Sequence, residues 1–126
     1  MKLQAIVDLF GCHIYTPELF DPERNVEFAF CADLMSDALM IMSTVKDTGM
    51  LEKGVLITGL ATNQSIRTAE MLDVEIVLLV RGKVPADQVI ELASESNVLL
   101  LGTKTTMFNA SGVLYSHGVR GITYQQ

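Results

Sequence analysis

The sequence predicts an α/β fold: one three-layer domain in which helices cover both faces of a mostly parallel sheet. Three short runs of Val, Ile and Leu carry this prediction, at 55–58, 75–80 and 98–101, and helical patterns at 64–73 and 86–96 separate them. Such runs are typical of strands buried on both faces, and their alternation with helices is typical of βαβ units with right-handed crossovers. A chain of 126 residues is expected to form one core and not two domains.

The N-terminal third predicts a helix and two strands. Apolar residues at helical spacing indicate a helix over 2–10, which Gly11 ends at the C′ position. A short strand is expected at His13–Tyr15. The alternation of Val26, Phe28 and Phe30 with their neighbours then indicates a second strand.

Two further helices and the tail complete the predicted elements. Asp33 is a candidate N-cap for a helix over 34–43, which is apolar on nearly every side. One helical turn is expected within 44–54. A last helix is expected over 106–117, and the tail that follows adds an edge strand or an arm.

Charge and hydropathy argue against several classes of function. The chain has 9 Lys and Arg against 15 Asp and Glu, a net charge of −6 and a pI of about 4.7, which opposes binding to nucleic acids and to anionic membranes. Its apolar runs are far shorter than the roughly 18 residues of a membrane span, and Asp8 interrupts the first of them, so we expect no secretory leader. Cys12 and Cys31 form neither a disulfide framework nor a CxxC motif. We therefore expect a cytoplasmic protein.

Polar residues follow each of the three buried strands, where open parallel sheets bind ligands. The first of these loops brings together hydroxyls, an amide and a helix N-terminus, and the next two add cations. We therefore expect an anionic small molecule at this edge of the sheet. The candidate binding residues are Thr58, Gly59, Thr62, Asn63, Arg81, Thr103, Lys104 and Thr105.

A plainer interpretation of the same residues stays open. Thr62, Asn63, Thr105 and Thr106 are residues that a helix start needs for its unpaired N–H groups. In this interpretation Arg81 and Lys83 are only solvated residues of a loop. This fits Lys83 better than Arg81, because the turn before the next helix points outward.

Catalytic chemistry has little support in the sequence. His13 and His117 are the only histidines, no Ser or Cys lies in a GxSxG motif, and neither GxxxxGK[ST] nor GxGxxG occurs. Asp33 and Asp37 could hold Mg²⁺ or position a base, but acids in the first turn of a helix also complement its dipole. We expect no enzymatic activity, no metal and no cofactor. A small enzyme that uses Asp33 or Asp37 with His13 is the lesser alternative.

Four segments together resemble the DRTGG domain family: DLMSD (33–37), TGLATNQSIRTAEMLDV (58–74), VRGKVPADQVIELA (80–93) and GTKTTMFNASGVLY (102–115). The resemblance covers most of the chain, although the five-residue tag that names the family does not occur in it. It implies a Rossmann-like module with a core over about 1–118 and a C-terminal tail over 119–126. It also implies a likeness to the N-terminal domain of HPr kinase/phosphorylase and to the DRTGG domain of CBS-containing family II pyrophosphatases.

The same resemblance implies a module without catalytic residues that dimerises and accompanies a regulated partner protein. The residues add their own argument, because a small sheet can hardly cover every apolar side of the helix over 34–43. We therefore predict a homodimeric regulatory module that senses an adenine nucleotide or another phosphorylated metabolite. The alternative is a purely structural dimeric scaffold that acts on a partner protein. The candidate interface residues are Met35, Leu39, Met40, Met42 and Gly112.

Overall fold

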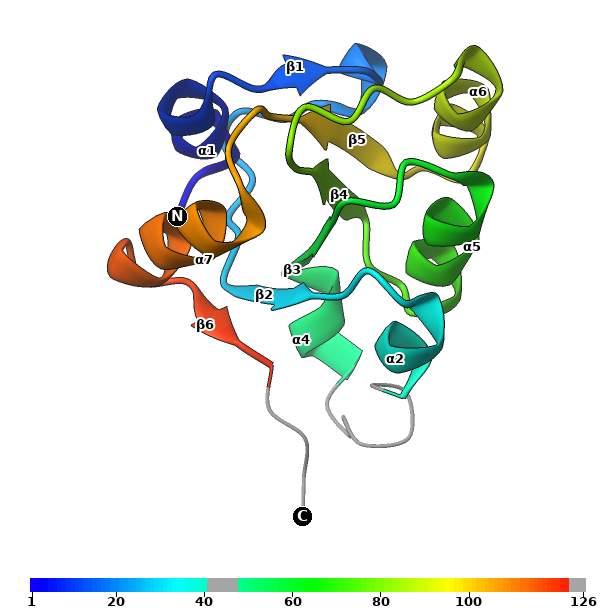
Figure 1. Cartoon of the computed structure of the whole chain (residues 1–126). Helices are drawn as coiled ribbons and strands as arrows, with labels where there is room; N and C mark the ends of the chain where they lie inside the picture. The colour runs from blue at the N-terminus through cyan, green and yellow to red at the C-terminus, as the bar shows by residue number, and fades with distance from the viewer. Residues whose placement is uncertain (41–47, 123–126) are drawn as a thin grey trace.

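A six-stranded sheet forms the centre of the computed structural model, which describes residues 1–40 and 48–122 (Figure 1). The strand order is β1-β5-β4-β3-β2-β6. Among these strands β1 pairs antiparallel with β5, and every other neighbouring pair is parallel. The predicted α/β fold with a mostly parallel sheet is confirmed. The strands are β1 (His13–Ile14), β2 (Phe28–Cys31), β3 (Gly54–Thr58), β4 (Ile76–Leu79), β5 (Leu99–Gly102) and β6 (Arg120–Gly121).

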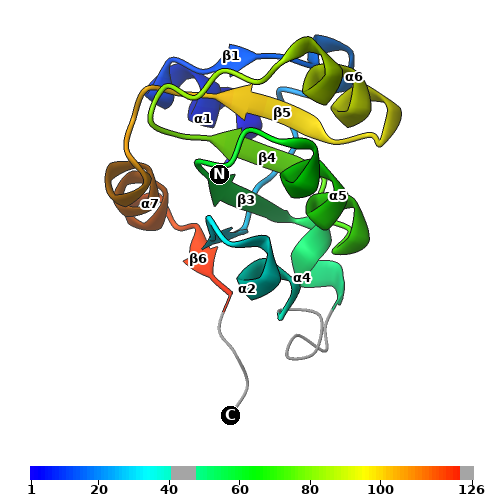
Figure 2. The same cartoon turned by 45° about the vertical axis from the view of Figure 1, so that its right-hand side comes forward.

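Helices cover both faces of the sheet (Figures 1 and 2). One apolar core lies under α2, α4, α5 and α6, and a second lies under α1 and α7. Neighbouring residues of one strand serve opposite cores, Leu56 the first and Ile57 the second, which is why the strands are continuous apolar runs. The helices are α1 (Leu3–Phe10), a 3-10 turn (Pro17–Leu19), α2 (Met35–Leu39), α4 (Thr48–Glu52), α5 (Asn63–Met71), α6 (Asp87–Glu95) and α7 (Met107–Ser116).

The N-terminal segment lies along the outer edge of β5. Gly11 ends α1 in the left-handed conformation, with φ of 56°, and its N–H donates to the carbonyl of Val7. This confirms the predicted end of the first helix. The following strand β1 is held to β5 through Thr16, whose buried hydroxyl oxygen accepts from the N–H of Leu100 at 2.9 Å. The N-terminal segment thereby reaches the carboxyl end of the sheet.

The second predicted helix differs from its expected form. Within the described residues the helix is α2, Met35–Leu39, and its N-cap is Leu34, so the prediction that Asp33 caps it is wrong. The carboxylate of Asp33 bonds across the sheet edge instead, because a backbone donor and a cation lie there. Positions 41–43 of the predicted helix lie outside the described residues.

The structure also contains the helical turn expected before β3 and the edge strand expected in the tail. The helix α4 supplies the turn that was expected within 44–54. The predicted edge strand of the tail is β6, which pairs in parallel with β2. None of the helices in the described part of the chain has the length and apolar character needed to traverse a bilayer.

Candidate ligand-binding site

The loops after β4 and β5 leave the sheet toward opposite faces. After β4 the chain continues to α6 on one face, and after β5 it continues to α7 on the other (Figure 2). Adjacent parallel strands whose connections diverge leave a crevice at their carboxyl ends, where ligands bind in open α/β sheets. Two backbone hydrogen bonds of 2.9 Å hold the loops together, from the N–H of Arg81 to the carbonyl of Thr105 and from Gly82 to Thr103.

A pocket of about 360 Å³ opens at this point, and we call it the edge pocket. Its volume lies within the range of roughly 300–1,000 Å³ that is usual for small-molecule sites. Three segments that are distant in sequence form its walls. Phe10, His13 and Tyr15 come from the N-terminal segment, and Lys83, Thr103 and Lys104 come from the strand-end loops.

Lys83 and Lys104 differ from the basic residues elsewhere in the described chain. Both side chains are exposed, and across residues 1–40 and 48–122 neither ammonium has a hydrogen bond or an ion pair. Arg120 bonds to backbone carbonyls. Two uncompensated positive charges therefore lie at one pocket of a chain whose net charge is −6. The remaining described basic residues form the pairs Lys2–Glu23, Arg24–Glu75, Lys53–Glu27, Arg67–Glu70 and Arg81–Asp33.

Arg81 belongs to a separate cluster on the other side of β4. Its guanidinium Nη1 lies 3.2 Å from Oδ2 of Asp33, and Oδ1 of the same carboxylate accepts from the N–H of Gly59 at 2.7 Å. Gly59 makes room for the guanidinium, because a Cβ at this position would lie 2.0 Å from Nη2 of Arg81. The N–H of Gly59 is the largest cause that lowers the pKa of Asp33, and Arg81 and Thr58 lower the pKa further. This cluster joins the carboxyl ends of β2, β3 and β4.

The structure separates the predicted binding residues after β3 from those after β5. The buried hydroxyl of Thr58 accepts from the N–H of Leu60 at 3.1 Å and donates to Asp33, and Gly59 also bonds to Asp33. The polar groups of Thr58 and Gly59 are therefore used within the protein. Thr62 is the N-cap residue of α5 without a side-chain cap bond, and Asn63 is the first residue of that helix.

The predicted residues after β5 lie at or beside the edge pocket. Thr103 and Lys104 line it. The hydroxyl of Thr103 is already occupied, because it donates to the carbonyl of Phe10 at 2.8 Å and accepts from the N–H of Thr105 at 3.2 Å. Thr106 caps α7 by accepting from the N–H of Asn109. Lys104 is thus the residue of the predicted set whose polar group is exposed and unpaired at this pocket.

Sequence reasoning missed three residues of this site. Lys83 was counted among the cations at the strand ends but left out of the candidate binding residues, because loop solvation explained it more readily, yet it lines the edge pocket beside Lys104. Tyr15 was expected only as part of a strand, and His13 as part of that strand or, in the lesser alternative, as a catalytic partner of Asp33 or Asp37. Their position depends on the antiparallel pairing of β1 with β5, and no local pattern in the sequence indicates that pairing.

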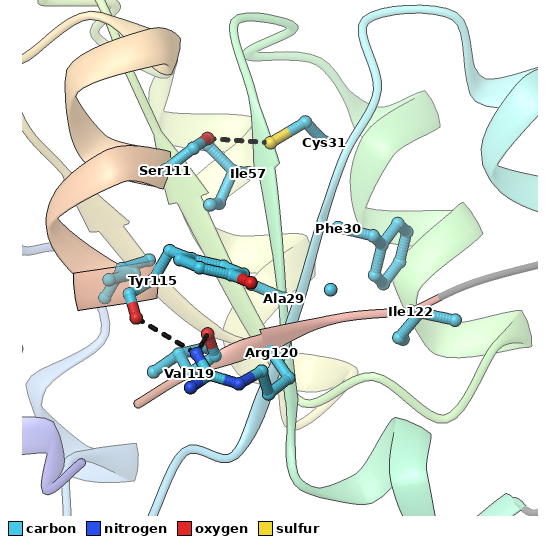
Figure 3. Close-up of a pocket in the computed structure, with 11 residues that line it drawn as sticks. Ala29, Phe30, Cys31, Ile57, Ser111, Tyr115, Val119, Arg120 and Ile122 are labelled. Atoms are coloured by element: carbon cyan, nitrogen blue, oxygen red, sulfur yellow. Dashed lines mark hydrogen bonds between the residues drawn. The ribbon is translucent and has the colours of Figure 1, made fainter. Parts of the chain in front are cut away.

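A second pocket of about 310 Å³ lies between α7 and the strands β2 and β6 (Figure 3). The guanidinium carbon of Arg120 lies 4.6 Å from the ring centroid of Tyr115, and its Nη1 donates to the carbonyl of Tyr115 at 3.1 Å. Sγ of Cys31 lies 3.1 Å from the hydroxyl of Ser111. Since the guanidinium of Arg120 is already engaged by the Tyr115 ring and by backbone carbonyls, this pocket offers less to an anion than the edge pocket does.

The two thiols are expected to react at different rates. Burial raises the pKa of Cys12 to about 11, so its reactive thiolate is rare at pH 8, whereas Cys31 is exposed. Iodoacetamide at pH 8 should therefore modify Cys31 well before Cys12, as followed by peptide mass spectrometry. In urea the two cysteines should react at similar rates. Faster labelling of Cys12 in the folded protein would contradict the burial argument.

The cluster at Asp33 predicts a pH dependence of stability. The pKa of Asp33 is lower in the folded protein than in the unfolded chain, where it is about 3.9. The carboxylate therefore stabilises the fold at pH values above about 3.9, and this stabilisation is lost as the pH falls through the folded pKa. In Asp33→Asn the free energy of unfolding should depend less on pH below about pH 4. At neutral pH it should cost about 1 kcal/mol or less, because the ion pair is half-exposed.

Gly59→Ala separates the two interactions of Asp33. The added methyl displaces the flexible end of Arg81 but leaves the N–H of Gly59 in place. The fall in stability below about pH 4, which we call the acid limb of the stability curve, should therefore remain. Urea unfolding between pH 2.5 and 7 measures both variants. An acid limb that is unchanged in Asp33→Asn would show that this carboxylate does not carry it.

No protein-family model and no curated protein matches this sequence. Among solved structures, the chain is similar to the CBS and DRTGG domains of the regulatory region of Clostridium perfringens pyrophosphatase, with a TM-score of 0.62 and 17% identity. That structure is a complex with an activator, diadenosine tetraphosphate. The match covers 90% of this chain and 45% of the other, so this chain spans less than half of its length. The likeness shows a shared α/β fold.

Proposed function

We propose that this protein is a non-catalytic regulatory module of DRTGG type that binds an anionic metabolite in the edge pocket. The observation that carries the proposal is the pair Lys83 and Lys104, two ammonium groups without a carboxylate partner in the described chain, at one pocket of an acidic protein. The likeness to a regulatory region supports regulation over catalysis. A regulated partner protein, which binding would affect, belongs to the same proposal.

Phosphate is the anion that this site fits best. A phosphate monoester carries roughly −1.5 to −2 charges at neutral pH, so one group can engage both ammonium groups. Lysine binds phosphate as a point charge, and a hydrogen bond to a charged group contributes about 1.5–3 kcal/mol. A phosphorylated metabolite or an adenine nucleotide would meet this requirement. The activator of the similar structure is itself a phosphate-bearing adenine compound.

Arg81 has a lesser role in this proposal than the two lysines. Its guanidinium is paired with Asp33, so a ligand would have to compete with a carboxylate for it. Thr58, Gly59, Thr62 and Asn63 lie on the same side of β4 as that cluster, and they remain candidates for a ligand that extends beyond the edge pocket.

A thermal-shift panel of phosphorylated compounds tests the proposed function. A ligand at about 100 times its Kd stabilises the folded state by roughly 2.7 kcal/mol, which should raise the Tm of a domain of this size by several degrees. The panel holds AMP, ADP, ATP, acetyl phosphate and sugar phosphates, with the unphosphorylated compounds as matched controls. No shift with well-folded protein would contradict the sensor and favour a structural scaffold.

We also propose that the module is a homodimer that uses the outer face of α7. Phe108, Gly112 and Tyr115 lie at helical spacing on that face, and their two aromatic side chains are 84% and 64% exposed. A Cβ at Gly112 would have no neighbour within 4 Å among residues 1–40 and 48–122, so the described chain leaves this position open. The helix carries no charged side chain. A second copy could therefore approach closely at the glycine and cover both rings.

Of the candidate interface residues predicted from the sequence, those on and after α2 are not at the centre of this interface. Met35 is packed into the core at 2% exposure, Leu39 is half-buried and Met40 is 56% exposed. Met42 lies outside the described residues. The centre of the proposed interface is therefore Gly112, and Met40 lies on the other face of the sheet.

Gly112→Glu should convert the dimer to a monomer. The charge would enter the centre of the apolar contact, whereas in a monomer glutamate favours the helix over glycine by about 0.5–1 kcal/mol. Sedimentation velocity at micromolar concentration measures the change, with Gln88→Glu as the control at an exposed position of α6 on the other face of the sheet. A wild-type protein that is already monomeric would overturn the proposal.

A further inference from the structure

We infer that the edge pocket binds a ligand that carries a flat ring as well as a phosphate, as a nucleoside monophosphate does, and that His13 and Tyr15 form the wall that contacts the ring. The inference rests on the proposed function, since it names the ligand class of the same pocket. It assigns a role to two aromatic residues that the anion site alone leaves unused.

Both rings line the edge pocket and contact each other there. His13 and Tyr15 are two residues apart on an extended segment, so their side chains point to the same side, and their ring centroids are 4.4 Å apart. His13 is exposed and Tyr15 is half-buried, so part of each ring remains open to a ligand. Aromatic side chains at such a surface stack on flat unsaturated rings.

The backbone fixes the tyrosine in this position. The N–H of Tyr15 donates to the carbonyl of Leu100 at 2.9 Å. The ring lies against Gly102, where an added Cβ would be only 2.8 Å from Cε2 of the ring. A side chain at position 102 would therefore displace the ring. Tyr15 is thus oriented by its neighbours before any ligand binds.

The cations lie on the strand-end loops that form the rest of the pocket. The stem of Lys104 passes beside Gly82, with Cγ 4.0 Å from the place of an added Cβ, and Lys83 follows in the same loop. The pocket therefore offers two aromatic rings on the N-terminal segment, inclined by 50° to one another, and positive charge on the loops. Its volume of about 360 Å³ lies near the lower end of the usual range, which favours one nucleotide unit over a dinucleotide.

Isothermal titration with three probes tests the inference: AMP, ribose 5-phosphate and adenosine. We expect AMP to bind more tightly than ribose 5-phosphate by roughly 5- to 100-fold, the range that one stacked base contributes. Tyr15→Leu removes the ring, and Tyr15→Phe keeps it. His13→Ala alters an exposed position and tests the same wall should Tyr15→Leu fail to fold. Tyr15→Leu and His13→Ala should weaken AMP while leaving ribose 5-phosphate within twofold, and Tyr15→Phe should retain AMP binding.

The outcomes separate this inference from the proposed function. Equal binding of AMP and ribose 5-phosphate, unaffected by the ring variants, would overturn the ring wall and leave the anion site standing. Binding of adenosine as tight as that of AMP would overturn the phosphate site. Failure of all three probes to bind, together with a flat thermal-shift panel, would overturn both.

Discussion

Charge reversal of both edge-pocket lysines, Lys83→Glu with Lys104→Glu, is expected to lower the affinity for a phosphorylated ligand by about 100-fold or more. Each lost hydrogen bond to a charged group costs about 1.5–3 kcal/mol, and 1.4 kcal/mol is a factor of ten. The two new carboxylates would also repel the phosphate. Both side chains are exposed and unpaired within the described chain, so the fold should keep its stability.

The matched control is Lys2→Glu with Lys53→Glu, which changes the net charge by the same amount. Those lysines pair with Glu23 and Glu27 on the surface, so each reversal replaces an exposed ion pair by two exposed carboxylates, a change of about 1 kcal/mol at each site. Titration calorimetry at fixed salt should show affinity near wild type for the control. An equal loss in both variants would mean that the overall charge, and not the edge pocket, governs binding.

The second large effect concerns the central strand. Leu56→Ala should lower the free energy of unfolding by about 2–5 kcal/mol, because the leucine is fully buried under the helices of one face and its removal leaves a cavity. Such a loss is a large part of the roughly 5–15 kcal/mol by which most domains are stable. Leu34→Ala is the matched control, since that leucine is 66% exposed. It should change the stability by less than about 0.5 kcal/mol.

Urea unfolding followed by circular dichroism measures both variants. A shift of the midpoint with an unchanged slope would mean that Leu56→Ala altered stability alone. A loss below 1 kcal/mol would contradict the assignment of Leu56 to the core. An equal loss in Leu34→Ala would instead indicate that Leu34 is covered in solution, for example by a second copy.

Local sequence patterns were sufficient to predict most helices and strands, but they did not predict the order of the strands in the sheet. The apolar runs of β3, β4 and β5 and the stop at Gly11 depend on neighbours in sequence, so periodicity and capping rules were sufficient. The antiparallel edge position of β1 depends on the buried hydroxyl of Thr16 and on pairing with a strand far along the chain. A pattern confined to a few residues cannot encode such a partner.

The site was predicted in part for the same reason. The cations after β4 and β5 could be placed at one edge because parallel strands end together, and Lys104 does line the edge pocket. Asp33 was expected as a helix cap, but the N–H of Gly59 and the guanidinium of Arg81 offer it stronger partners across the sheet. His13 and Tyr15 could not be placed without the pairing of β1. Tertiary contacts therefore decided which polar groups remained open to a ligand.

The most direct test of the central claim is a titration of ¹⁵N-labelled protein with AMP, followed by amide chemical shifts. The account predicts that the largest changes fall on Gly82, Lys83, Gly102 and Lys104, around the edge pocket. Changes confined to the pocket between α7 and β6, or an unchanged spectrum at millimolar AMP, would contradict the claim that this edge of the sheet binds a phosphorylated ligand.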